Sequence, residues 1–238
     1  MHIADRRHKA NGILAALPDE ELARIRSRFE RVELPLGSVI HEPNAPLKYV
    51  YFPLSGIISL LNLMEDGSCG EISVIGNEGV ESVVLFMGGE RSPNRGVVQG
   101  ELTAIRLPAR VVKEEFARGG ALQRLLLRYT QALMVQMGQT VVCNRHHTVD
   151  KQLCRWLLLS FDRMGSDHLV MTQELIANML GVRREGVTCA ARKLQEAGLI
   201  KYSRGHITLL DRDGMEERAC ECYRVVRQEY DRLLGAYC

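Results

Sequence analysis

The sequence predicts an α+β protein with an N-terminal β jelly-roll barrel, a long helix and a C-terminal winged helix-turn-helix. Three patterns carry this prediction. Short apolar runs separated by glycines fill residues 32–107, heptad-like spacing follows in residues 122–140, and two short helical patterns flank Gly181. We therefore expect two domains, one over residues 1–143 and one over residues 144–238.

Composition places the chain among ordinary soluble globular proteins. Of its 238 residues, 46% are hydrophobic and 25% are charged, which is enough apolar material for two packed cores. No apolar run reaches the roughly 18 residues of a membrane span, and the start MHIADRRHKANG lacks the apolar segment of a secretory signal. The seven cysteines have no paired spacing, which favours reduced thiols and predicts a cytoplasmic protein.

The N-terminal half begins with a helix and continues as strands. Within residues 13–31, the spacing is that of an amphipathic helix after Pro18, with Leu22, Ile25 and Phe29 inward. The strands that follow are rich in β-branched residues, with a glycine about every ten residues. We expect KYVYFPLSGIISLLNL to form two strands about residues 53–56, and MEDGSCGEISVI to form a hairpin. Eight such strands would make the jelly roll.

The pattern becomes helical again after Pro108, and we expect a helix over about residues 110–143. Residues recur along it in steps of three and four, as in a coiled-coil seam: Leu122, Leu126, Tyr129, Leu133, Met137 and Thr140. This seam either pairs two copies of the chain or packs against the chain's own barrel.

A polar break over residues 144–148 is the predicted hinge between the two domains. The helix that follows it carries Trp156 on its apolar face. Near the end of the chain, Asp213 is the predicted N-cap of a terminal helix over residues 214–234. We expect this terminal helix to pack on the helix-turn-helix.

The stretch MTQELIANMLGVRREGVTCAARKLQEAGLI predicts two helices joined by a tight turn. Thr172 caps the first helix, and Gly181 ends it because glycine adopts a left-handed conformation at little cost. The second helix spans about residues 183–197, buries a stripe that begins at Val187, and ends at Gly198. Such a pair is a helix-turn-helix, whose second helix fits the major groove of DNA.

Basic residues concentrate on this second helix and on the hairpin that follows it. Strands over residues 199–202 and 206–210 flank a turn at residues 203–205 and form the wing. Between Gly181 and His206 there are six Lys/Arg and two acids, a net charge of +4, whereas the whole chain carries +2. This concentration indicates a surface for DNA phosphates. The alternative is a ligand-binding barrel protein whose winged helix contacts another protein.

The sequences GVRREGVTCAARKLQEAGLI and SRGHITLLDR resemble the winged helix of the CRP–FNR family of bacterial transcription regulators. The resemblance extends over essentially the whole chain, because that family places a barrel, a dimer helix and a winged helix in this order. It implies a homodimeric regulator that reads a palindromic operator in double-stranded DNA, with RNA polymerase as a further partner. Because dimers read two half-sites, it favours the seam in residues 122–140 as the subunit contact.

The resemblance also assigns candidate DNA contacts. That family usually has an Arg-Glu pair at the start of its reading helix and an arginine one turn later. Here Arg184 and Glu185 match the pair, but Cys189 replaces the arginine and cannot bond guanine bidentately, so the usual half-site is not expected to carry over. The predicted base-reading residues are Arg184, Glu185, Thr188, Cys189 and Arg192. The predicted phosphate contacts are Arg183, Lys193, Lys201 and Arg204.

The barrel of that family is a sensory domain, and some members bind a cyclic nucleotide there. They use a Gly-Glu pair and, about ten residues later, Arg-Ser/Thr. In EGVESVVLFMGGERSPNRGVVQGEL these places hold Val83-Val84 and Asn94-Arg95. The candidate effector residues are therefore Glu81, Arg91 and Arg95, in a geometry different from that of the family's cyclic-nucleotide site. A cyclic nucleotide is disfavoured as a cofactor, and the alternatives are another small effector or none.

Other reactive residues give no catalytic pattern. Cys143, His146, His147 and Cys154 would have to converge across a helix break, so we assign them structural or surface roles and expect no metal site. Cys189 is a candidate thiol whose oxidation would oppose DNA binding. There is no P-loop, Gly-x-Ser-x-Gly, His-Glu-x-x-His or Rossmann motif, so we predict that the chain is not an enzyme.

Overall fold

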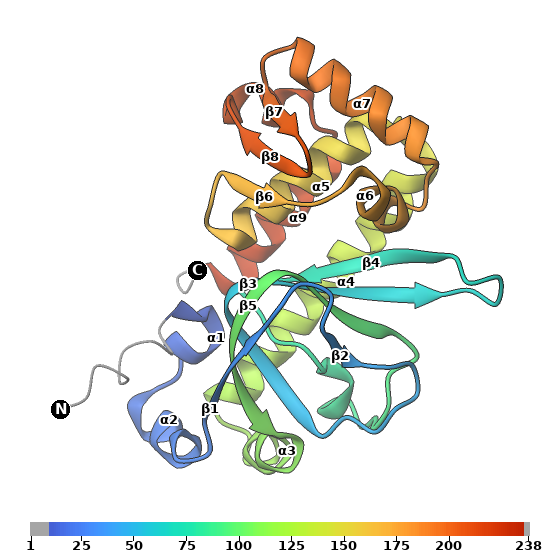
Figure 1. Ribbon diagram of the computed structural model, residues 1–238. Helices are drawn as coiled ribbons and strands as arrows, with labels where there is room; N and C mark the ends of the chain where they lie inside the picture. The colour runs from blue at the N-terminus through green and yellow to red at the C-terminus, as the bar shows by residue number, and fades with distance from the viewer. Residues whose placement is uncertain (1–9, 236–238) are drawn as a thin grey trace.

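The barrel consists of antiparallel strands that bend around an apolar core in the lower half of Figure 1. The structure is a computed structural model that describes residues 10–235. The barrel strands are β1 (Glu30–Leu34), β2 (Val39–His41), β3 (Tyr49–Leu63), β4 (Cys69–Ile75) and β5 (Arg95–Pro108). They pair in the order β1-β5-β3-β4, and β2 also pairs with β5. This is the predicted α+β class, with barrel, long helix and winged helix-turn-helix in the predicted order.

The described barrel has five strands instead of eight, because its two longest strands continue through bends. The segment about residues 53–56, expected to separate two strands, lies inside β3, where the register against β5 shifts twice. Gly56 absorbs the bend at φ +83°, and a Cβ there would lie 2.3 Å from the Glu101 carbonyl oxygen. The predicted hairpin through Asp66 and Gly67 is confirmed, because β3 and β4 flank this turn and Leu63 of β3 pairs with Cys69 of β4.

The first helical segment is shorter than predicted. The helix predicted after Pro18 is α2 (Asp19–Arg26), which begins there but ends before Phe29; α1 (Gly12–Ala15) precedes it, and β1 begins at Glu30. Pro18 is the N-cap of α2, because proline is tolerated at a helix start and not inside it. Leu22 and Ile25 are buried as predicted, but Phe29 follows the helix and packs against the core from the loop.

The long helical segment is also divided. A short 3-10 turn, η3 (Val83–Leu85), precedes β5, and β5 leads into α3 (Ala109–Ala117) and α4 (Ala121–His146). The single helix expected over residues 110–143 is interrupted at Gly119–Gly120, where the chain turns. The carboxylate of Glu21 accepts hydrogen bonds from the backbone N–H groups of Ala121 (2.7 Å) and Leu122 (3.0 Å), which caps the start of α4.

The seam predicted to pair two subunits faces the interior of this chain. Leu122, Leu126, Tyr129, Leu133 and Thr140 are buried within one copy, and Met137 is half-buried. The alternative, packing against the chain's own elements, is therefore correct for this seam. An apolar heptad stripe shows only that one side of a helix is covered, and here β4 and the C-terminal helix α9 cover it.

The C-terminal domain is built on α5 (Val149–Met164). It contains β6 (His168–Val170), α6 (Gln173–Leu180), α7 (Arg184–Glu196), β7 (Ile200–Ser203) and β8 (His206–Leu209). The two wing strands were predicted, whereas β6, which pairs with β8, was not. The polar break is narrower than the predicted 144–148, because α4 continues to His146 and α5 begins at Val149.

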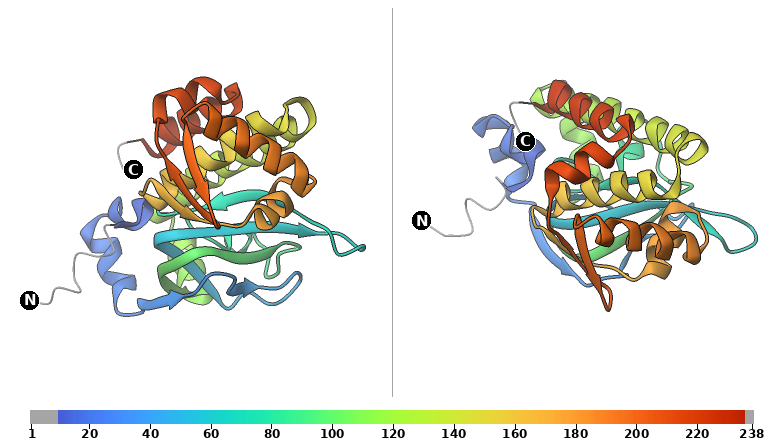
Figure 2. Two further views of the ribbon diagram at one scale, coloured as in Figure 1. Left: turned by 45° about the horizontal axis from the view of Figure 1, so that its top comes forward. Right: turned by 90° about the horizontal axis from the view of Figure 1, so that it is seen from above.

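The terminal helix differs from its prediction in two ways. It is broken into α8 (Arg212–Arg218) and α9 (Glu221–Leu234), and Asp211, not Asp213, caps α8 by accepting from the Gly214 N–H at 3.0 Å. In addition, α9 lies along α4 and not on the helix-turn-helix, as the right-hand view of Figure 2 shows. The rings of Tyr129 and Tyr230 meet edge to face between these helices, with centroids 6.3 Å apart.

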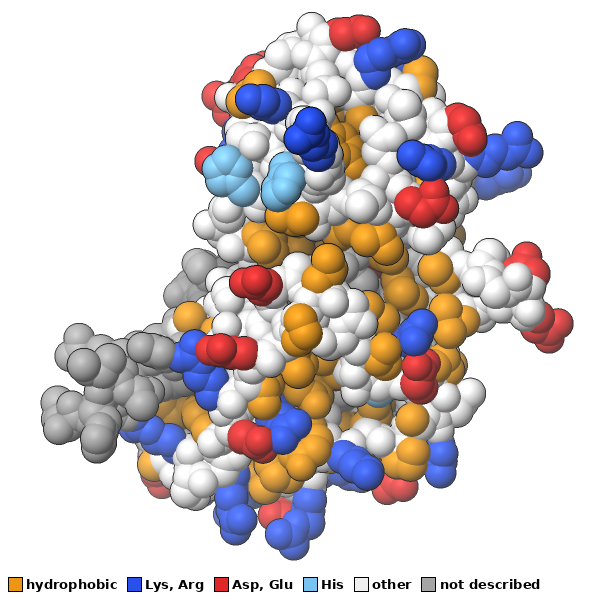
Figure 3. Space-filling model, in the orientation of Figure 1, with side chains coloured by type: hydrophobic (Ala, Val, Ile, Leu, Met, Phe, Trp, Pro, Cys, Tyr) orange, Lys and Arg blue, Asp and Glu red, His pale blue; other side chains and the backbone are white. Residues whose placement is uncertain are grey.

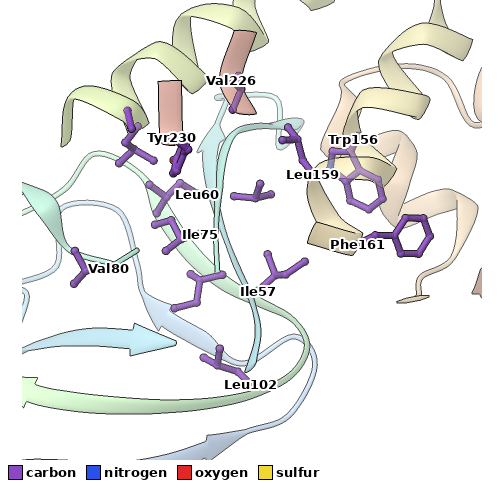
Figure 4. Close-up of a cluster of buried hydrophobic side chains, with 14 of the residues drawn as sticks. Ile57, Leu60, Ile75, Val80, Leu102, Trp156, Leu159, Phe161, Val226 and Tyr230 are labelled. Atoms are coloured by element: carbon purple, nitrogen blue, oxygen red, sulfur yellow. The ribbon is translucent and has the colours of Figure 1, made fainter. Parts of the chain in front are cut away.

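The two halves share a continuous apolar core (Figure 4). Side chains of α5 and α9 gather beside side chains of the barrel strands; those labelled include Trp156, Leu159, Val226, Tyr230, Leu60 and Ile75. A buried carboxylate, Glu71 of β4, joins the halves by accepting hydrogen bonds from Trp156 Nε1 (2.8 Å), Ser59 Oγ (2.6 Å) and Gln99 Nε2 (2.9 Å). Burial raises the pKa of Glu71 to about 7, although these hydrogen bonds oppose the rise.

Candidate nucleic-acid interface

The helix-turn-helix has the predicted geometry. Thr172 caps α6 by accepting from the Leu175 N–H at 3.2 Å, and Gly181 ends α6 in the left-handed conformation, at φ +65°. The second helix, α7, begins at Arg184, one residue later than predicted, and ends at Glu196. These local signals suffice because a cap, a glycine and an apolar stripe specify helix ends without help from distant residues.

The two sides of α7 are chemically distinct. Its inner side is buried against α5 and α6 through Val187, Ala190, Ala191 and Leu194. Every predicted base-reading residue is on the outer side and exposed: Arg184, Glu185, Thr188, Cys189 and Arg192. Figure 1 shows α7 at the outer edge of the molecule, away from the barrel. The outer side of α7 is thus open to a large partner.

The polar contacts on this face are weak or internal to the helix-turn-helix. Arg184 Nε lies 3.9 Å from a Glu174 carboxylate oxygen, and these two side chains are 65% and 63% exposed, so solvent screens the pair. Arg192 lies 3.7 Å from Glu196 in an equally exposed pair. Thr188 donates its hydroxyl to Gln173 at 2.6 Å, which ties α7 to the start of α6. Both arginines can therefore exchange their partners for DNA at small cost.

The wing projects from the same domain as a tight hairpin. Arg204 (φ +50°) and Gly205 (φ +83°) form a two-residue turn with both backbones left-handed, the type that matches strand twist. The Tyr202 hydroxyl donates to the Met171 carbonyl at 2.7 Å, which fixes the hairpin beside α6. All four predicted phosphate contacts are exposed: Arg183, Lys193, Lys201 and Arg204. Figure 3 shows Lys and Arg side chains projecting from this upper part of the molecule.

The three candidate effector residues do not converge on one pocket. Glu81 is buried inside the barrel, with one oxygen 2.9 Å from His41 Nε2 and the other accepting from the Ser82 hydroxyl. Arg91 is exposed and donates to the Asn44 carbonyl at 2.6 Å. Arg95 pairs with Glu42 at 2.9 Å. The two arginines thus bond to surface loops, whereas Glu81 bonds to His41 and Ser82.

A small cavity lies next to this buried group. Its volume is about 170 Å³, and His41, Tyr49, Tyr51 and Ser82 are among its lining residues. Typical small-molecule pockets have volumes of about 300–1,000 Å³, so this cavity is small for a nucleotide.

The sequence analysis considered only half of a cluster at the domain junction: it weighed Cys143 and His147 but did not include Cys220 and Cys222. The side chains of Cys143, His147, Cys220 and Cys222 meet there, with their ligand atoms all within 4.8 Å of one another. His146, considered with them, is exposed. The available signals were Cys-x₃-His, which places two ligands on one helical turn, and Cys-x-Cys at the start of the terminal helix.

The thiols in this cluster interact directly. Cys143 and Cys220 are buried, and their sulfurs are 3.5 Å apart. The hydrogen bond from the Cys143 thiol lowers the pKa of Cys220.

The chain thus combines a barrel, a long helix and an exposed basic winged helix-turn-helix. Comparison with known families identifies the helix-turn-helix in the same place. Residues 151–218 match the family of Crp-like helix-turn-helix domains, so the chain carries a domain of that kind. The resemblance to the CRP–FNR family of transcription regulators is confirmed in this domain and in the fold as a whole.

Solved structures with this fold include a CRP/FNR-family protein from Eubacterium rectale, with 20% identity, a TM-score of 0.68, and coverage of 88% of this chain and 98% of that one. FixK2 from Bradyrhizobium japonicum has 16% identity and a TM-score of 0.68, covering 81% of this chain and 98% of its own. The global regulator CLP from Xanthomonas campestris, described as c-di-GMP responsive, has 14% identity and a TM-score of 0.65, covering 82% and 100%. At such identities the likeness is one of fold.

The search of curated proteins returns no match. Among the described residues, no helix combines the length and the apolar character needed to cross a membrane.

Proposed function

We propose that this chain is a bacterial transcription regulator of the CRP/FNR type that binds double-stranded DNA in a sequence-specific manner. The observation that carries the proposal is the outer side of α7, where all five predicted base-reading side chains are exposed. Arg184, Glu185 and Thr188 would contact base edges, with Cys189 and Arg192 beside them. Arg183, Lys193, Lys201 and Arg204 would contact phosphates and position the helix in the groove.

We further propose a homodimer held by a second stripe on α4, different from the seam predicted from the sequence. Leu127, Met134 and Val141 follow one another at intervals of seven residues and are 51%, 63% and 69% exposed. Gly138 lies in the same stripe, and a Cβ there would meet no atom within 4 Å. Exposed apolar residues at heptad spacing support a helix-to-helix contact between two copies. Such a dimer would present two copies of α7 to a palindrome.

Selection of bound fragments from random double-stranded DNA tests the first proposal. We expect a palindromic consensus with half-sites about one helical turn apart, and affinity that falls steeply between 50 and 200 mM salt, as expected for about six phosphate contacts. Failure to enrich any sequence, together with a flat salt response, would refute DNA binding. It would favour the alternative of a barrel protein whose winged helix contacts another protein.

The dimer is tested by Met134→Lys, with Met87→Lys as the matched control. Met87 is 61% exposed, close to the 63% of Met134, but it lies in the turn after η3 and outside α4. The unmodified chain and the control should have about twice the chain mass of 26.8 kDa in light scattering, whereas Met134→Lys should have the mass of one chain. A Met134→Lys protein that remains dimeric would contradict this stripe as the contact.

We also propose that the barrel controls DNA binding through a small effector. The cavity of about 170 Å³ beside His41 supports an occupant smaller than a cyclic nucleotide. Calorimetry with cyclic AMP and cyclic GMP should give no binding heat, and micromolar binding of either would contradict this part. RNA polymerase is the further partner that the family likeness implies, in the cytoplasm.

A further inference from the structure

The cluster at the domain junction unites residues from two distant parts of the chain. Cys143 lies in the last turn of α4, and His147 is the C-cap of that helix. Cys220 is the N-cap of α9, and Cys222 lies in the first turn of α9. The ends of these helices therefore meet at one point, and each helix contributes two side chains to it.

The spacing of these side chains fits a single metal ion. Cys143 Sγ and Cys220 Sγ are 3.5 Å apart, and Cys222 Sγ is 3.7 Å from His147 Nδ1. In a tetrahedral zinc site with Zn–S of about 2.3 Å and Zn–N of about 2.0 Å, adjacent ligand atoms lie roughly 3.5–3.8 Å apart. These two separations match that requirement, and all four ligand atoms lie within 4.8 Å of one another.

The surroundings of His147 are those of a metal ligand. Its Nδ1 faces the cluster, while its Nε2 lies 3.4 Å from a carboxylate oxygen of Glu221. Metal-binding histidines commonly donate their other ring N–H to a carboxylate, which fixes the ring orientation. The backbone of His147 is held as well, because its carbonyl accepts from Gln152 Nε2 at 2.8 Å and its N–H donates to the Cys143 carbonyl at 3.0 Å.

Charge and burial support the same conclusion. Cys143, Cys220 and Cys222 are 0%, 4% and 1% exposed and form an apolar cluster of their own, apart from the main core. Three thiolates around a divalent ion leave one negative charge, and the buried Arg155 guanidinium acts electrostatically on Cys143 and Cys222. A disulfide between Cys143 and Cys220 would use two of the four groups and would leave His147 and Cys222 unexplained.

We propose that Cys143, His147, Cys220 and Cys222 bind one Zn²⁺ ion in a closed tetrahedral site that fastens the start of α9 to the end of α4. Sulfur and imidazole ligands in this geometry select zinc among the common divalent ions. The three thiols release their protons to solvent when the ion binds, and no electron is transferred. With four protein ligands the ion has no open position, so its role is to hold the junction.

Metal analysis of the full-length chain, purified under reducing conditions from zinc-supplemented cells, tests the site. We expect one equivalent of zinc per chain. Cys222→Ser and His147→Gln should lose the metal, while Cys154→Ser, another buried cysteine on α5, and Cys69→Ser should retain it. Glu221→Gln should weaken zinc affinity about 10–100-fold, because it removes the carboxylate partner of His147 without removing a ligand.

A second measurement covers variants that fold poorly. Chelator-treated chain titrated with Co²⁺ should develop the intense visible bands of tetrahedral cobalt and a thiolate-to-cobalt charge-transfer band at one equivalent. Iron with inorganic sulfide, a Cys143–Cys220 disulfide in a chain that takes up no metal, or zinc retained by both Cys222→Ser and His147→Gln would each overturn the proposal. These outcomes do not depend on DNA binding, so the zinc site and the proposed function can fail separately.

Discussion

The barrel interior and the outer side of α7 both carry charged side chains, but they hold them in opposite ways. In the barrel, His41 and Glu81 are buried 2.9 Å apart. Where β4 meets α5, the buried Glu71 accepts three hydrogen bonds. On α7, the side chains of Arg184 and Arg192 are 65% and 70% exposed, and their carboxylate partners lie 3.9 and 3.7 Å away. Buried charges with fixed partners specify one arrangement of the fold. Exposed charges with weak partners remain available for a ligand.

The largest effect is expected where the long helix meets the barrel. Leu126 is fully buried, whereas its neighbour Leu127 is 51% exposed. Leu126→Ala should lower the free energy of unfolding by about 2–5 kcal/mol, because it leaves a cavity in the core. Leu127→Ala, measured by denaturant unfolding at low protein concentration, should change it by less than about 0.5 kcal/mol. Equal losses in the two variants would contradict the assignment of Leu126 to the core and of Leu127 to the exposed side of α4.

The next effect is the pH dependence that Glu71 imposes. Its pKa of about 7 lies above the ordinary 4.5, so the folded state holds this proton more tightly than the unfolded state. The stability it contributes is present below pH 4.5 and is lost as pH rises through about 7, by roughly 3 kcal/mol in total. Glu71→Gln, which is neutral at all pH values, should flatten the unfolding free energy between pH 5 and 8.

His41 supplies an internal control for that experiment. Burial lowers its pKa, but the hydrogen bond and the charge of Glu81 outweigh burial and leave it raised. Its contribution to stability is therefore also lost as pH rises above 6.5, so some slope should persist in Glu71→Gln. An unchanged slope in that variant would contradict the assignment to Glu71.

A smaller effect, confined to DNA binding, is expected on α7. Arg184→Ala should reduce the preference for the selected sequence by about 1–3 kcal/mol and leave binding to random DNA nearly unchanged. Binding isotherms on both DNAs measure this, with Arg110→Ala on α3 as the control, since Arg110 has a side chain that is 77% exposed. An equal loss on both DNAs would refute base reading by Arg184.

The smallest effect should come from the wing. Arg204→Ala should weaken binding to all sequences alike and reduce the slope of log affinity against log salt by about 1, the value for one phosphate contact. Lys48→Ala, which changes an exposed residue beside the barrel, is the matched control and should leave the salt dependence of the affinity unchanged. Selective loss on the preferred sequence would assign Arg204 to base recognition instead.

The same contrast explains what the sequence could predict. The helix-turn-helix is specified by neighbours in sequence: the cap at Thr172, the left-handed Gly181 and the apolar stripe of α7. The exposed reading face followed from that periodicity alone. The strand β6 escaped notice because three residues carry too little pattern to predict a strand.

Features that depend on distant residues were predicted poorly. The seam through Leu126 was correctly identified as apolar, but periodicity does not say whether the barrel, α9 or a second copy covers it. Pro53 and Gly56 are residue types typical of a turn, but here they lie inside β3. Gly56 permits a bend within the strand because it has no Cβ to collide with the Glu101 carbonyl oxygen. The junction cluster brings Cys143 beside Cys220 across 77 positions in sequence, and it becomes visible only when α9 is placed on α4.

The meeting of Cys143 with Cys220 has a consequence for motion. The chain leaves the long helix α4 near Cys143 and returns to it near Cys220, at the same corner of the molecule. Residues 148–219 are therefore connected to the rest of the chain like an inserted domain, through two linkers that lie side by side. Swinging this unit about that corner stretches no covalent connection. Its orientation is therefore set by side-chain contacts, chiefly those of α5 and α6 with β3 and β4 and those of α5 with α4 and α9.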